Sequence, residues 1–132
     1  MKHPDWQKRL VTTIKAAEKR PFSWGKNDCC LFAADCVKAM CGEDFGVEFR
    51  GKYDSETGAK KAILRGGGSL ERVLARFLDE VSPHLIQRGD IAVVVNAGRR
   101  CAGVFYGGCV WVPGVDGLVG LRGKIMSAWR VK

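Results

Sequence analysis

The sequence predicts an α+β domain in which N-terminal helices pack on a small antiparallel sheet. Apolar residues recur at helical spacing over residues 5–78, whereas short β-branched and aromatic runs separated by glycine turns follow Pro83. The 132 residues suffice for one hydrophobic core and are too few for two. We therefore expect one domain over residues 1–132.

Four segments of the first half have the apolar spacing of helices. The predicted ranges are 5–19, 29–40, 55–65 and 70–78. The second helix is apolar on nearly every side, so it should be the buried central helix. Asp28 is a good N-cap for it and Gly42 a good stop, while Ser55 and Ser69 precede the last two helices as caps.

Five short runs of the second half are predicted to be strands. Their ranges are 91–95, 101–106, 109–112, 118–121 and 127–131. The turn at residues 88–90 leads into the first strand, and residues 96–98 turn the chain after it. Gly107-Gly108 is a two-residue hairpin loop. Because the connections are this short, the strands should form an antiparallel meander.

Composition excludes several classes of protein. Hydrophobic residues make up 46%, which is too many for a disordered chain, and no run is long enough to span a membrane. The first residues have no apolar segment of the secretory kind, so we expect folding in a cytoplasm. The net charge of +8 favours an anionic neighbour, but the aromatic residues do not interleave with the basic ones, so nucleic acid is an unlikely partner.

The six cysteines do not resemble a secreted disulfide framework. Cys29 is predicted at the first turn of the central helix, where unpaired N–H groups lower a thiol pKa and can receive an oxyanion. Cys30 points about 100° away around the helix and is predicted to pack. The spacing of Cys29, Cys30, Cys36 and Cys41 leaves a metal-binding module open as an alternative.

Two stretches carry a family resemblance. Trp24-Gly25 followed by Asp28-Cys29 resembles the start of the catalytic helix in NlpC-type papain-like cell-wall peptidases. Residues 88–91 and 101–107 resemble the turn into the first core strand of that family and its histidine-bearing strand. The signature from Trp24 to Asp35 also resembles a small phage-encoded family related to these peptidases, whose members sit among tail genes. The resemblance implies a papain-like NlpC-type fold over residues 1–132.

The sequence departs from the peptidase pattern at two positions. Cys101 occupies the place of the catalytic histidine, and the third polar residue falls near the apolar Trp111-Val112. Without a base, Cys29 loses an activation of about 10²–10⁴-fold. The two histidines, His3 and His84, are interpreted as surface residues, with His84 as a remote candidate for a relocated base.

The resemblance implies a tail-tip or tail-assembly structural protein with a degenerate peptidase fold. Its partners would be hub and tail-tip proteins, its location the virion tail after synthesis in the bacterial host cytoplasm. The alternative is an active cysteine peptidase or amidase that cleaves peptidoglycan stem peptides during phage entry, so whether the chain is an enzyme stays open. No cofactor is expected in either case.

The candidate site residues follow from these arguments. Cys29 is the candidate nucleophile and Cys101 its neighbour in the place of the histidine. Trp24, Asp28 and Cys30 are candidate binding residues, because they flank Cys29 in the sequence. Cys29 and Cys101 could form a disulfide if their Cα atoms lie within about 7 Å. Asp35, within the same central helix, is expected to pair with a basic residue such as Arg50.

Overall fold

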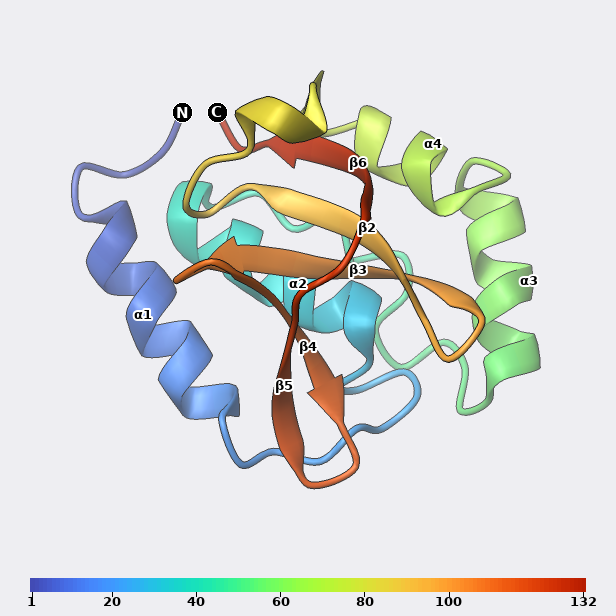
Figure 1. The fold of residues 1–132 in the computed structure, drawn as a ribbon. Coiled ribbons are helices and arrows are strands. Elements are labelled where there is room, and N and C mark those ends of the chain that lie inside the picture. Colours follow the sequence, from blue (N-terminus) through green and yellow to red (C-terminus); the bar gives the residue numbers. More distant parts are fainter.

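The computed structural model describes residues 1–132 and has helices packed on a six-stranded antiparallel sheet (Figure 1). The helices are α1 (Trp6–Ala17), α2 (Cys29–Cys41), α3 (Glu56–Gly66), α4 (Leu70–Ala75) and the short 3₁₀ helix η1 (Pro83–Leu85). The strands are β1 (Asp79–Val81), β2 (Ile91–Asn96), β3 (Arg99–Tyr106), β4 (Cys109–Gly114), β5 (Gly117–Leu121) and β6 (Ile125–Arg130). The predicted α+β class is confirmed. None of the helices combines the length and apolar character that a membrane span requires.

The strand order is β1-β6-β2-β3-β4-β5, and every neighbouring pair is antiparallel. Strands β2 to β5 form the predicted meander, with Gly107-Gly108 as the loop between β3 and β4. The last predicted strand, residues 127–131, is present as β6 at Ile125–Arg130, but it does not continue the meander. The connection after β5 crosses in front of β2 and β3, and β6 then pairs with the far side of β2 (Figure 1). This crossing covers a face of the sheet on which no helix lies.

The fourth helix is shorter than its apolar pattern predicted. It ends at Ala75, and the backbone N–H groups of Phe77 and Leu78 both donate to the Leu74 carbonyl in a final turn. Leu78 is nevertheless buried, so the helical spacing of apolar residues continues past the helix itself. The chain then enters β1, a strand that the sequence did not predict and that pairs with β6.

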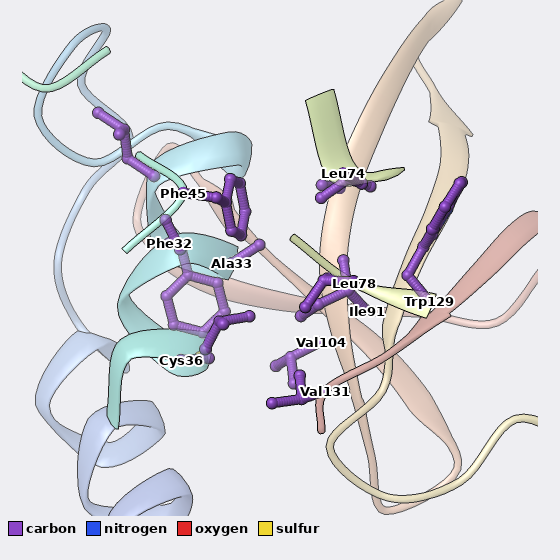
Figure 2. Close-up of a cluster of buried hydrophobic side chains, with 14 of the residues drawn as sticks. Phe32, Ala33, Cys36, Phe45, Leu74, Leu78, Ile91, Val104, Trp129 and Val131 are labelled. Carbon is purple, nitrogen blue, oxygen red and sulfur yellow. The ribbon is translucent and has the colours of Figure 1, made fainter. Parts of the chain in front are cut away.

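Helix α2 is apolar all around because it is covered on two sides. Helix α1 packs on one side and strand β3 on the other. Phe32 and Cys36 lie on the helix side of the main core cluster, opposite Ile91 and Val104 of the sheet (Figure 2). The predicted central position of this helix is confirmed.

A second, smaller cluster occupies the other face of the sheet. Ala92 and Val94 belong to it, whereas Ile91 and Val93 belong to the main core, as the alternation along a strand requires. Cys101 of β3 is a further member, and Cys29 packs against the cluster from the start of α2. The two cysteines therefore meet where the small cluster reaches the end of the central helix.

The predicted helix caps are all present. The Asp28 carboxylate accepts from the Leu31 N–H, the Ser55 hydroxyl from the Gly58 N–H and the Ser69 hydroxyl from the Arg72 N–H. Gly42 adopts the left-handed conformation that ends α2, with φ of 86°. These local signals fix where α2 starts, and with it the place of Cys29.

We predict that Phe32→Ala lowers the free energy of unfolding by about 3–5 kcal/mol, because it opens a cavity between α2 and the sheet. Urea denaturation followed by circular dichroism measures the change. Leu64→Ala on α3 is the control, since Leu64 is 66% exposed and its loss should change stability by less than about 0.5 kcal/mol. Equal effects of the two substitutions would contradict the assignment of Phe32 to the core.

Candidate functional site

The loop before α2 is held by its own backbone. The Ser23 N–H donates to the Asn27 carbonyl over 3.0 Å, and the Asn27 N–H donates back over 2.8 Å. The Asn27 side-chain amide also donates to the carbonyl of Pro21, over 2.9 Å. Trp24 therefore lies on a loop whose two ends are hydrogen-bonded to each other, next to Cys29.

Asp28 makes three hydrogen bonds and is almost fully buried. Its Oδ1 accepts from the Leu31 N–H over 3.0 Å, which is the predicted cap. Its Oδ2 accepts from the Gly25 N–H over 3.0 Å and from the Tyr53 hydroxyl over 2.6 Å. The loop, the helix and the irregular segment around Tyr53 are thus joined by one carboxylate. Burial and this hydrogen bond raise the pKa of Tyr53, so the hydroxyl keeps its proton.

Gly25 is required by its surroundings. Its φ of +78° favours glycine, and a Cβ built there would lie 1.9 Å from the Tyr53 carbonyl oxygen. The Gly25 carbonyl accepts from the Gly51 N–H over 2.8 Å. The Trp24-Gly25 pair is therefore explained by the close docking of this loop on residues 51–53.

Cys29 and Cys101 are direct neighbours. Cys29 is the first residue of α2, and Cys101 lies on β3, the strand against which α2 packs. Cys29 packs against the small cluster that contains Cys101, and both thiols line one pocket. The Cys101 thiol donates to the Arg99 carbonyl over 3.7 Å. The expected approach of Cys101 to Cys29 is confirmed. All six cysteines are free thiols.

The acidities of the two thiols differ from the expectation for Cys29. The neighbouring Cys101 thiol, burial and the adjacent Asp28 carboxylate together raise the pKa of Cys29. The Cys29 thiol beside it and the Arg99 guanidinium lower the pKa of Cys101 despite its burial. The direction for Cys29 is thus opposite to the one expected from its place at the helix start alone.

A pocket of about 480 Å³ opens onto both thiols. It brings together all five candidate site residues, which are Trp24, Asp28, Cys29, Cys30 and Cys101. Eleven of its 17 lining residues are hydrophobic, so the cysteines face a mostly apolar space. The Trp24 ring packs edge-on against Phe22, with ring centroids 4.7 Å apart.

Two arginines of β3 line the same pocket, and sequence reasoning did not select them. The Arg99 guanidinium lies 5.5 Å from the centre of the Trp24 ring and 3.6 Å from the Glu56 carboxylate of α3. Arg100 forms an ion pair with Glu71 of α4. The sequence has these two arginines directly before Cys101. Because the strand was predicted to start only at residue 101, neither arginine was placed on it. These pairs tie the β2–β3 hairpin to α3 and α4.

The remaining predictions around α2 concern packing. Cys30 packs against the main core, and burial raises its pKa to about 12, so it is a poor candidate for a reactive thiol. The expected ion pair between Asp35 and Arg50 is present, with a distance of 2.8 Å. Arg50 also binds Asp44 over 2.9 Å.

Neither histidine lies in the pocket. The His3 N–H donates to the carbonyl of Met40, near the opposite end of α2 and roughly 16 Å from Cys29 along the helix axis. His84 is exposed in η1. Nowhere do three or more histidine, cysteine or acidic side chains come together as metal ligands. The metal-binding alternative for the cysteines of α2 is thus not supported, because a helix directs them apart.

Fold and site define an α+β domain in which a half-buried cysteine and a buried one line an apolar pocket. Residues 1–131 match a protein family described as a domain of unknown function, DUF6950, and the chain belongs to this family. A comparison with curated proteins gives no match.

We expect Tyr53→Phe to lower the free energy of unfolding by about 1.5–3 kcal/mol, since it removes a hydrogen bond to a buried carboxylate. Chemical denaturation measures the loss. Tyr106→Phe, on β3, is the matched control and should change stability by less than about 0.5 kcal/mol. A Tyr53→Phe protein as stable as its control would show that the Asp28 contact contributes nothing.

Alkylation with iodoacetamide should modify Cys101 at lower pH than Cys29. The thiolate is the reacting form, and the structure stabilises it on Cys101. Peptide mapping over a pH series gives the rate for each cysteine, with the buried Cys36 as an unreactive internal reference. Faster alkylation of Cys29 than of Cys101 at every pH would restore Cys29 as the more acidic thiol.

Proposed function

We propose that the chain is a structural component of a phage tail tip or of its assembly, built on a papain-like fold of NlpC type without the catalytic histidine. The family resemblance assigns the nucleophile to Cys29 and the base to residue 101. In the structure these two residues are neighbours across the contact of α2 with β3. This juxtaposition supports the papain-like interpretation of the fold.

The observation that carries the proposal is the thiol at residue 101. In a cysteine peptidase an imidazole takes the proton of the nucleophile. Here Cys101 interacts with Cys29 as a second thiol, and the pKa of Cys29 is raised rather than lowered. Val112, near the place of the residue that orients the base, is fully buried in the small apolar cluster. General-base activation of Cys29 therefore lacks both of its partners.

These features favour binding over peptide cleavage. The active peptidase or amidase remains the competing function, because an apolar pocket with a cysteine at its base would suit a peptidoglycan stem peptide. Its nucleophile would have to ionise beside the Asp28 carboxylate with no base on this chain. A role in docking on hub or tail-tip proteins in the virion tail requires no such step. The net charge of +8 suits an acidic partner surface.

The test is complementation of a phage that lacks this gene. We expect deletion to stop tail assembly and both wild type and Cys29→Ala to restore it, with the protein found in purified particles by mass spectrometry. Absence of the chain from tails, or failure of a folded Cys29→Ala variant to assemble, would overturn the proposal. Incubation with isolated cell-wall sacculi is the second arm: we expect no release of stem-peptide fragments. Release that Cys29→Ala abolishes would establish the peptidase instead.

A further inference from the structure

The proposed tail role leaves the thiol pair unused. Cys29 and Cys101 are two free thiols that meet where α2 packs on β3, and both line one pocket, so a ligand in that pocket can reach both sulfurs. The pair joins two elements that are far apart in the sequence, because Cys29 begins α2 and Cys101 lies in β3. Cys30 also lines the pocket, but it packs against the main core, on a different side of α2 from Cys29. Cys36, Cys41 and Cys109 do not line the pocket.

The two thiols are not equivalent. Arg99 lines the same pocket as Cys101, and its guanidinium stabilises negative charge on the Cys101 sulfur. The Asp28 carboxylate opposes negative charge on Cys29. A thiol that ionises readily next to one that keeps its proton is the division of roles that thiol–disulfide exchange requires.

We propose that Cys101 and Cys29 form a dithiol site that reduces small disulfides entering the pocket, with Cys101 as the attacking thiol and Cys29 as the resolving thiol. This inference goes beyond the proposed function and does not depend on tail assembly. The apolar lining with Trp24 at its side suits the uncharged body of a small disulfide.

The exchange proceeds in two balanced steps. The Cys101 thiolate attacks one sulfur of the substrate disulfide, forms a mixed disulfide and releases the first substrate thiolate. This thiolate serves as the base that takes the proton of Cys29, and the Cys29 sulfur attacks Cys101. The second substrate thiolate leaves, takes up a proton from solvent, and the Cys29–Cys101 disulfide is closed. Two protein thiols are oxidised and one disulfide is reduced to two thiols.

The experiment uses the full reduced chain and bis(2-hydroxyethyl) disulfide, an uncharged probe. Alkylation and peptide mapping follow each cysteine with time. We expect the Cys29–Cys101 disulfide as the main product of the wild type. With Cys29→Ser, the mixed disulfide should accumulate on Cys101, because nothing resolves it. With Cys101→Ser, oxidation of the chain should slow by at least about tenfold.

Cys41→Ser is the matched control, because Cys41 is a partly exposed thiol at the opposite end of the same helix and should not affect the reaction. Arg99→Gln tests the charge without touching either sulfur. It should slow the first step near neutral pH and move its pH midpoint upward, with the rate regained at high pH. Circular dichroism checks that each variant folds.

Three results would overturn the inference. One is probe adducts spread over all exposed cysteines with no Cys29–Cys101 disulfide. Another is a Cys101→Ser protein that reacts through Cys29 as fast as the wild type. The last is an Arg99→Gln protein with an unchanged pH profile. None of these outcomes bears on whether the chain assembles into tails, so the two proposals fail separately.

Discussion

The site depends on the Asp28 carboxylate. One buried side chain caps α2, holds the Gly25 backbone and binds the Tyr53 hydroxyl. Because a buried carboxylate without partners is costly, all three donors have to be in place together. The start of α2, the turn that carries Trp24 and the segment beside it are therefore fixed as one unit, and the pocket is preformed around Cys29.

The same carboxylate shapes the chemistry of the pocket. It lies one residue before Cys29 and opposes a thiolate there. Arg99 lies two residues before Cys101 on β3 and favours a thiolate on Cys101. The helix start by itself would favour ionisation of Cys29. The neighbouring thiol, burial and the capping carboxylate all oppose a thiolate on Cys29, whereas Arg99 favours one on Cys101. The cap and the arginine thus act in the same direction, and the sulfur on the sheet is the more acidic one.

Local signals in the sequence predicted what is local in the structure. The cap at Asp28, the stop at Gly42 and the hairpin at Gly107-Gly108 depend on neighbours within a few residues, and all are present. Tyr53 could not be found this way, since its bond to Asp28 spans 25 residues from an irregular segment. The position of β6 beside β2 also has no local cause.

The early end of α4 shows that apolar spacing does not fix where a helix ends. Its apolar spacing continues through residue 78 because Leu78 is buried, but burial alone does not decide between a helix and a turn. In the site, the approach of Cys101 to Cys29 was predicted through the family resemblance and is confirmed, whereas the acidities were not, because they depend on Arg99 and on the exact contact of the thiols.

The chemistry at residue 101 fits its surroundings. Cysteine packs as a small hydrophobic residue and needs no strong hydrogen-bond partner, so it sits in the cluster with Val94, Val110 and Val112 without leaving a polar group unpaired. The apolar residue at 112 belongs to the same cluster, so the two positions are consistent with each other: both are filled by side chains that need no buried hydrogen-bond partner. The small cluster can therefore be tightly packed up to the sulfur of Cys101, while the pocket on its other side leaves that sulfur accessible.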